Sequence, residues 1–291
     1  MQIAKTPQAV RSLSESWRVA GQKVGFVPTM GALHEGHLAL VRRGRSECDK
    51  LVASIFVNPT QFGAGEDVDS YPRGFERDYE LLREAGCEAL FVPTVEAMYG
   101  RPSVELSGSG ERAFVEVGGL GELWEGAERP GHFRGVATVV TMLFNAVTPH
   151  RAYFGEKDYQ QLKVIERMVR DLLFDIEIVP CQTVREPDGL AMSSRNVNLS
   201  SEERQAAPVL AQALEKGVAL VTSGERDAAR LVRAMRDVCE TQPLVTLQYV
   251  AVVDAETLLP LKSLGKRPAR ALIAAHVGNT HLIDNMTLPS A

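Results

Sequence analysis

Short apolar runs recur along the first 181 residues, each bounded by glycine, proline or charged positions. Runs of this length and composition predict strands that are covered on both faces, as in a parallel sheet. The five runs are residues 24–29, 51–57, 89–94, 152–157 and 176–181.

Between several of these runs, apolar residues recur every three or four positions, which predicts amphipathic helices. Thr6 and Pro7 mark the start of the first helix and Gly21 its end. The alternation of strands and helices predicts an α/β fold with a doubly wound, Rossmann-like parallel sheet. The other helical stretches end near Gly86 or lie within residues 136–147 and 162–172, whereas residues 102–131 predict irregular structure at the sheet edge.

The pattern changes near Arg185. Ser200 and Glu203 predict a capping box, and apolar residues at helical spacing follow in two stretches before two alternating, strand-like runs at 245–253 and 271–277. We therefore predict a Rossmann-like domain over residues 1–184 and a smaller α+β domain with an antiparallel sheet over residues 185–291.

Composition narrows the possible functions. The 291 residues carry a formal charge of -5 and a pI near 5.8, which disfavours a nucleic-acid surface and favours a small-molecule partner. Scattered cysteines without a Cys-x-x-Cys pair predict buried, reduced thiols. A basic-then-apolar leader is absent, and no apolar run reaches the ~18 residues of a spanning helix, so we expect a cytoplasmic protein that does not insert in a membrane. The cysteines are Cys48, Cys87, Cys181 and Cys239.

The stretch with the clearest chemistry reads F-V-P-T-M-G-A-L-H-E-G-H over residues 26–37. It ends an apolar run, turns on glycine and opens a helix with His34 and His37, so we expect free backbone N–H groups, the helix dipole and both imidazoles to face one anion. A simple turn with two exposed histidines is the alternative. The spacing differs from a zinc-protease helix, and the chain has neither a Walker loop nor a dinucleotide fingerprint.

Residues 28–37 resemble the signature of the pantothenate synthetase family, among the His-x-Gly-His nucleotidyltransferases related to class I aminoacyl-tRNA synthetases. Further matching strings follow in the family's order at residues 54–62, 71–73, 154–162 and 188–196.

The resemblance implies an ATP-dependent ligase that condenses (R)-pantoate with β-alanine to give pantothenate, AMP and diphosphate. The intermediate would be pantoyl adenylate, and the product serves coenzyme A (vitamin B5) biosynthesis. An adenylyltransferase that leaves AMP on its product is an alternative, and a non-catalytic nucleotide-binding module is another.

The resemblance also implies roles for individual residues. His34 and His37 would stabilise the pentacoordinate α-phosphorus, and Lys157 would neutralise phosphate charge. Gln61, Gln161 and Asn58 would bind pantoate or β-alanine. Tyr71 and Asp78 are weaker candidates there, and Arg129 and His132 would lie near the site. The implied ATP-binding residues are Met30, Gly31, Ala32, Leu33, His34, Glu35, Gly36, His37, Gly155, Glu156, Lys157, Asp158, Val184, Met192, Ser193, Ser194 and Arg195.

The family likeness further implies a homodimer, a lid role for the C-terminal domain, and Mg²⁺ held mainly by ATP phosphates rather than by a protein metal site. The acidic stretch at 65–69 lacks the full ligand series of a calcium loop and reads as a solvated loop. The chain departs from the family pattern at Arg77, Met142, Gln182 and His281.

Overall fold

The computed structural model describes residues 1–63, 74–100 and 113–290. The chain forms two compact units. Unit 1 consists of Met1–Glu156 and Gln160–Gln182, and unit 2 consists of Lys157–Tyr159 and Thr183–Ala291. The boundary expected after residue 184 thus lies two residues beyond the division in the structure, and the short segment 157–159 groups with unit 2.

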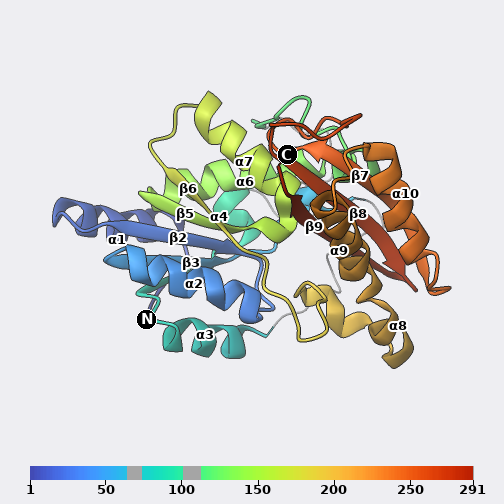
Figure 1. The fold of residues 1–291 in the computed structure, drawn as a ribbon. Helices are drawn as coiled ribbons and strands as arrows, with labels where there is room; N and C mark the ends of the chain where they lie inside the picture. The colour runs from blue at the N-terminus through green and yellow to red at the C-terminus, as the bar shows by residue number, and fades with distance from the viewer. Residues whose placement is uncertain (64–73, 101–112, 291) are drawn as a thin grey trace. The chain divides into compact units, whose positions relative to one another are not determined.

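Unit 1 is built on a six-stranded parallel sheet with the order β1-β4-β3-β2-β5-β6 (Figure 1). This confirms the predicted doubly wound parallel sheet. Strand β1 was not predicted, because a three-residue strand carries no periodic signal and β1 forms by pairing with β4. The strands are β1 (Gln2–Ala4), β2 (Val24–Thr29), β3 (Lys50–Ile55), β4 (Ala89–Phe91), β5 (Arg151–Gly155) and β6 (Glu177–Cys181).

Helices cover both faces of this sheet, with α2 and α3 below it and α6 above it in Figure 1. The predicted cap of α1 is present, because the Thr6 hydroxyl accepts a hydrogen bond from the Ala9 N–H at 3.2 Å. A short helix, α5, lies within the stretch predicted to be irregular. The helices are α1 (Pro7–Val19), α2 (Glu35–Glu47), α3 (Phe75–Glu84), α4 (Val95–Tyr99), α5 (Glu125–Glu128), α6 (His132–Val147) and α7 (Tyr159–Asp171), with 3-10 turns η1 (Pro59–Gln61) and η3 (Glu156–Asp158).

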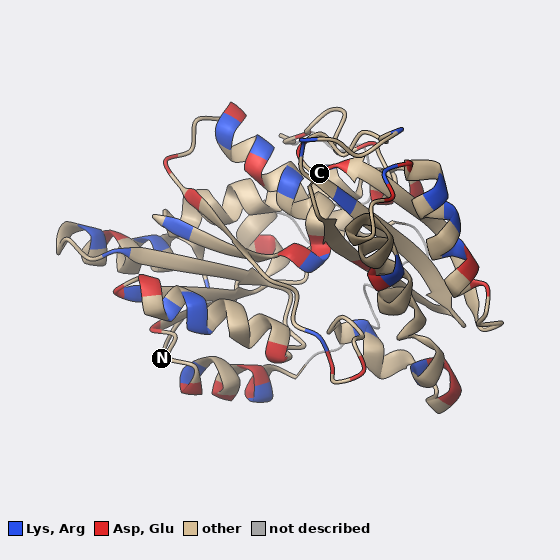
Figure 2. Ribbon diagram, viewed as in Figure 1, with Lys and Arg blue, Asp and Glu red and all other residues tan. Residues whose placement is uncertain are grey.

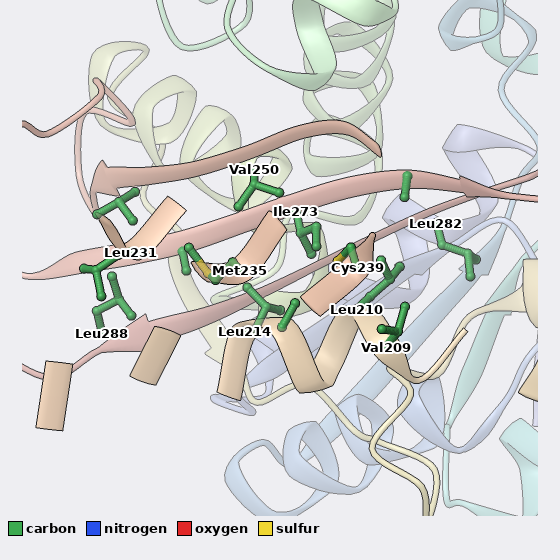
Figure 3. Packing of buried hydrophobic residues seen from close by; sticks show 14 of the residues in the cluster. Val209, Leu210, Leu214, Leu231, Met235, Cys239, Val250, Ile273, Leu282 and Leu288 are labelled. Carbon is green, nitrogen blue, oxygen red and sulfur yellow. The ribbon is translucent and has the colours of Figure 1, made fainter. Parts of the chain in front are cut away.

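Unit 2 is an antiparallel sheet, ordered β7-β8-β9, packed against helices. Its core joins the apolar faces of α9 and α10 to the sheet, with Leu214, Met235 and Ile273 near the centre (Figure 3). Strands β7 and β8 were predicted, whereas β9 was not, because the consecutive polar residues Asp284 and Asn285 interrupt its pattern. The elements are η4 (Ser194–Asn198), α8 (Ser201–Ala206), α9 (Val209–Thr222), α10 (Ala228–Cys239), β7 (Val245–Asp254), β8 (Ala269–Val277) and β9 (Thr280–Leu288).

The capping box predicted at the start of α8 is confirmed. Ser200 Oγ accepts from the Glu203 N–H, and Glu203 accepts from the Ser200 N–H at 2.7 Å. Charged residues of both signs are interspersed on the exposed faces of α3 and α10 (Figure 2). None of the helices formed by the described residues has both the length and the apolar composition needed to cross a membrane.

The four cysteines are free and buried, as predicted. Burial disfavours the thiolate, so it raises the pKa of Cys48, raises the pKa of Cys87 to about 12, and raises those of Cys181 and Cys239 to about 11. The thiols are therefore protonated at neutral pH, and only the thiolate is an effective nucleophile.

We expect iodoacetamide at pH 8 to label the folded protein very slowly and to label all four cysteines after unfolding in urea. Intact-mass spectrometry across a time course measures both rates. Rapid labelling of the folded protein would contradict the burial of these side chains.

Candidate active site

The strand order of the unit 1 sheet reverses between β2 and β5, a topology that commonly forms a ligand site. Strands β2 and β5 are neighbours, and the chain continues from β2 to β3 on one side and from β5 to β6 on the other. Such a reversal of strand order opens a crevice at the carboxyl ends of the strands. The motif of residues 30–37 follows β2, and Gly155 ends β5.

The turn after β2 is held by a buried carboxylate. Gly31 and Ala32 have φ values of 89° and 51°, and the Asp78 side chain accepts from the N–H groups of Ala32 and Leu33 at 2.8 and 2.9 Å. Asp78 is only 1% exposed. A Cβ on Gly31 would lie 3.2 Å from Asp78 Oδ2, so the left-handed turn and its carboxylate anchor both favour glycine there.

The two histidines cap the helix that the turn opens. His34 Nδ1 accepts from the Gly36 N–H at 3.1 Å, and His37 Nδ1 accepts from the His34 N–H at 3.3 Å. The ring centroids lie 4.1 Å apart. A backbone N–H can only donate, so a neutral ring in either position carries its proton on Nε2. The local geometry therefore makes both histidines Nε2–H donors.

The expectation of free backbone N–H groups in this motif is wrong for most of its residues. Ala32 and Leu33 donate to Asp78, and His34 and Gly36 donate to the two imidazoles. The N–H of Gly31 donates to the hydroxyl of the residue that ends β2. The sequence could not reveal this, because Asp78 lies 46 positions away from Ala32. The expectation of an anion site at this turn therefore rests on the two imidazoles and the helix dipole rather than on the backbone N–H groups.

Asn58 and Gln61 lie together beside Met30. Asn58 Nδ2 donates to the Gly135 carbonyl and to Gln61 Oε1, both at 3.2 Å. Asn58 Oδ1 accepts from the Thr60 N–H at 3.3 Å and from the Tyr99 hydroxyl at 2.7 Å. The Gly135 carbonyl and the Thr60 N–H fix which atoms of the Asn58 amide are nitrogen and oxygen. Because Asn58 Nδ2 is a donor, the Gln61 atom beside it must be the acceptor Oε1.

Gln61 consequently turns its NH₂ group away from Asn58, and this group lies 3.4 Å from Met30 Sδ. A thioether is a weak acceptor, and Gln61 is only 8% exposed. The NH₂ group of Gln61 thus has a weak acceptor beside it. Both donors of Asn58 are engaged within the protein, and one of them orients the Gln61 side chain.

His132 contacts this region from the start of α6, and Gln160 is held by a separate set of hydrogen bonds. His132 Nδ1 lies 2.8 Å from the Gln61 carbonyl oxygen, and His132 Nε2 lies 3.2 Å from an Arg129 guanidinium nitrogen. Buried Gln160 donates to the carbonyls of Leu120 and Leu123 and accepts from the Glu125 N–H. Gln161, the next residue, is half-buried in the first turn of α7.

In unit 2, Lys157 has a 17% exposed side chain whose Nζ lies 3.3 Å from Asp158 Oδ1. Its main-chain carbonyl accepts from Asn285 Nδ2 at 2.8 Å. Glu156 and Asp158 are half-buried with it in η3. The backbone of Lys157 is thus anchored by a bond that does not use its ammonium group.

The second predicted signature follows a small hairpin in unit 2. Arg185 and Ala191 form a β-bridge, and the Met192 N–H donates to the Val184 carbonyl at 3.0 Å. Ser193 then caps the 3-10 turn η4, with its hydroxyl accepting from the Arg195 N–H at 3.2 Å. Ser194 and Arg195 lie in that turn and are half-buried.

The predicted site residues divide between the two units. Met30–His37, Asn58, Gln61 and Asp78 gather in unit 1, whereas Lys157, Asp158, Val184 and Met192–Arg195 belong to unit 2. Glu35 is exposed, and its carboxylate pairs with Arg42 on the outer surface of α2. Tyr71 and the acidic stretch at 65–69 lie outside the described residues.

The departures from the family pattern have distinct surroundings. Arg77 donates to the Leu33 carbonyl at 3.0 Å and therefore also braces the turn. His281 faces His276 across β8 and β9, with ring centroids 5.3 Å apart. Met142 is half-buried on α6, and Gln182 is exposed after β6. Among residues 1–63, 74–100 and 113–290, no three His, Cys, Asp or Glu side chains gather as a metal site.

Comparison with known proteins identifies similar chains over the full length. The model of the pantoate-beta-alanine ligase family matches residues 2–287. A pantothenate synthetase of Rubrobacter xylanophilus is 66% identical, with 99% of this chain and 98% of that protein covered. One from Moorella thermoacetica is 52% identical, with 99% of each covered.

Solved structures agree with this likeness. Pantothenate synthetase from Thermus thermophilus superposes with a TM-score of 0.90 at 50% identity, covering 99% of this chain and 100% of that chain. Pantoate-beta-alanine ligase from Francisella tularensis, solved in complex with beta-gamma ATP and beta-alanine, gives a TM-score of 0.79 at 33% identity, covering 99% and 97%.

Proposed function

This chain belongs to the pantoate-beta-alanine ligase family, and on that premise we propose which of its residues act on ATP. It is an ATP-dependent ligase that makes pantothenate from pantoate and β-alanine. The paired imidazoles at the start of α2 carry the assignment of its phosphate site.

The reaction needs activation, because a carboxylate is a poor electrophile. In the first half-reaction, the pantoate carboxylate attacks the α-phosphorus of ATP and diphosphate leaves. In the second, the β-alanine amine attacks the acyl carbon of pantoyl adenylate, loses a proton and displaces AMP. The protein must align the reactants and stabilise negative charge that builds on the phosphorus oxygens.

His34 and His37 supply that stabilisation as hydrogen-bond donors. Their Nδ1 atoms accept from backbone N–H groups, so each Nε2–H can face an α-phosphate oxygen. Residues Met30–Leu33 line the nucleotide, with Asp78 holding their turn rigid. Glu35 and Gly36 contribute through the helix dipole rather than through side-chain contacts.

Unit 2 supplies the remaining charge. The Lys157 ammonium neutralises phosphate oxygens, beside Gly155, Glu156 and Asp158 in the same loop. The hydroxyls of Ser193 and Ser194 and the guanidinium of Arg195 follow the departing diphosphate, and Val184 and Met192 contact the nucleoside.

We expect unit 2, residues 185–291 in the main, to act as the lid that keeps water from pantoyl adenylate. The signature Met192–Arg195 follows a hairpin in that unit, which supports the assignment. Hydrogen exchange of residues 189–196 should slow when ATP binds. Unchanged exchange would remove the support for a lid.

Gln61 and Gln161 bind pantoate in this proposal, and the fixed amide of Gln61 gives a sharp prediction. Gln61→Glu keeps the shape but replaces the donor with a carboxylate that repels pantoate. We expect the KM for pantoate to rise roughly 100-fold, the equivalent of one lost bond to a charged group, with the KM for ATP nearly unchanged. Steady-state kinetics with each substrate varied measures both values.

Gln8→Glu is the control for this substitution, because it makes the same chemical change at an exposed position of α1. It should leave the KM for pantoate as it is. An equal rise in both KM values for Gln61→Glu would point to a distorted site instead of a lost pantoate contact.

Mg²⁺ enters this proposal with ATP. The residues assigned to the phosphates are imidazole, ammonium, hydroxyl and guanidinium donors, which suit phosphate oxygens rather than Mg²⁺. Bound to ATP, the ion neutralises phosphate charge. Activity in excess EDTA equal to that with Mg²⁺ would remove it from the reaction.

Two further assignments rest on family likeness and composition. We expect a homodimer, which light scattering at micromolar concentration would test. The four free thiols suit a reducing compartment, which supports a cytoplasmic location. Recovery of the protein in a membrane or secreted fraction of its host would contradict that location.

The central test is incubation of the protein with ATP, pantoate and labelled β-alanine. We expect labelled pantothenate in equal amount to AMP and diphosphate. Omitting β-alanine should leave pantoyl adenylate on the enzyme and stop AMP release. AMP retained on the final product would instead indicate the adenylyltransferase alternative.

A further inference from the structure

Two consecutive residues of β9, Asp284 and Asn285, each hold one of the unit 2 segments assigned above to ATP. We infer that they are positioning residues, which set the places of the Lys157 segment and of the hairpin leading to Met192–Arg195. This inference rests on the proposed function, and all the contacts that carry it lie within unit 2.

Asp284 anchors the hairpin by an ion pair with Arg185. Its two carboxylate oxygens accept from the Arg185 guanidinium at 2.6 and 2.9 Å, and Asp284 is only 4% exposed. The same guanidinium donates to the Gly189 carbonyl at 2.9 Å. A two-bond pair of this kind fixes direction as well as distance. Because Arg185 and Ala191 are paired, both limbs of the hairpin depend on this contact.

Asn285 anchors the Lys157 segment by a hydrogen bond to its main chain. Its Nδ2 donates to the Lys157 carbonyl at 2.8 Å, and its Oδ1 accepts from Arg270 Nε at 2.5 Å. A carbonyl can only accept and this Nε–H can only donate, so the orientation of the Asn285 amide is determined. Asn285 is 4% exposed.

Arg270 ties the same segment to the sheet at a second point. Its guanidinium carbon lies 3.8 Å from the centre of the Tyr159 ring, and the Tyr159 hydroxyl donates to the Ala255 carbonyl at 3.0 Å. These contacts explain why residues 157–159 group with unit 2 although residues 156 and 160 belong to unit 1.

The two anchors are also joined to each other. The Asn285 N–H donates to Asp284 Oδ1 at 2.7 Å, and Arg185 Nη2 lies 3.4 Å from the Asn285 carbonyl oxygen. Neither anchor uses the ammonium group of Lys157 or the hydroxyls of the signature. The buried pair Asp284 and Asn285 therefore fixes the backbone positions of both phosphate-binding segments. It does so without occupying the side-chain groups that would bind the phosphates. Ordering both segments before ATP binds lowers the entropy cost of aligning them.

Asn285 bonds the main-chain carbonyl of Lys157, whereas the ammonium group is assigned to the phosphates, so the two roles can be altered separately. Asn285→Asp keeps the acceptor for Arg270 but places a carboxylate oxygen against the Lys157 carbonyl. We expect single-turnover diphosphate release at saturating ATP and pantoate to slow roughly 10-fold to 100-fold, as for a small misplacement of a catalytic group. Aminolysis of preformed pantoyl adenylate by β-alanine should keep its rate.

The decisive measurement repeats Asn285→Asp in a Lys157→Ala background. If Asn285 acts through Lys157, the second substitution should slow diphosphate release less than about 2-fold there, as expected for residues that act as one unit. Its effect on the melting temperature should persist, because the Lys157 carbonyl remains. An equal slowing in both backgrounds, or none in either, would overturn the inference.

Failure of the proposed function is distinguishable, because Lys157→Ala alone would then leave diphosphate release unchanged. Asp284→Asn in an Arg195→Ala background tests the other anchor by the same criterion. Asp227→Ala, which removes the N-cap of α10 in the same unit, controls for lost stability and should leave both half-reactions intact.

If Asn285→Asp does not fold, Arg270→Lys takes its place in the same two backgrounds. It keeps the buried cation but loses the Nε–H that orients Asn285. The same ratio of rates supports or overturns the inference.

Discussion

His37→Gln slows formation of pantoyl adenylate roughly 100-fold to 1,000-fold, the cost of removing one transition-state hydrogen-bond donor. Glutamine can replace the structural part of His37, because at the third position of a helix its side chain accepts from the N-cap N–H. His37 makes that bond to the His34 N–H in this chain. The substitution thereby removes the Nε2–H donor and retains the cap. Rapid-quench measurement of diphosphate release in a single turnover gives the rate.

His37→Ala separates the two roles of this side chain. It should slow the same step as much as His37→Gln, but it should also destabilise unit 1 by about 1 kcal/mol through loss of the cap. Thermal unfolding followed by circular dichroism measures that difference. If His37→Gln restored the full rate, His37 would be a helix cap without a part in the chemistry.

Lys157→Ala slows the same step by a similar factor, roughly 100-fold to 1,000-fold, because a cation near the transferred phosphoryl group stabilises the transition state more than the ground state. The folded structure should tolerate this change. Only the main-chain carbonyl of Lys157 is held by Asn285, and the ion pair of its ammonium with half-exposed Asp158 contributes little to stability. Single-turnover rates and the melting temperature measured on the same sample check both statements.

Lys216→Ala is the matched control, since it removes an exposed lysine from α9 of the same unit. Its adenylation rate should equal that of the unchanged protein. A Lys157→Ala variant with a normal rate would exclude Lys157 from phosphate neutralisation and would leave the imidazoles to carry the site.

Local signals in the sequence predicted much of the fold. The apolar run at 24–29 coincides with β2, and the caps at Thr6 and Ser200 are formed as expected. Each cap joins residues three positions apart and the strand is one contiguous run, so pattern and propensity suffice to find them. By contrast, β1 exists only through its pairing with β4, and no local pattern marks it.

The motif of residues 30–37 identified the candidate phosphate site, but not how its backbone is satisfied. The N–H groups expected to bind an anion are taken by Asp78 and by the histidines themselves. Asp78 anchors this turn, a structural role that its sequence position does not indicate. No local signal in helix α3 indicates the distant N–H groups from which Asp78 accepts.

Residue types and their order along the chain were enough to predict the α/β class, the antiparallel second unit and the family's reaction. Each of these predictions depends on short contiguous sequence patterns. Only folding brought Asn285 to the carbonyl of Lys157, 128 positions away, and Asp284 to Arg185, 99 positions away. Buried polar groups must find partners wherever the packed chain supplies them, and the identity of a distant partner has no local trace in a single sequence.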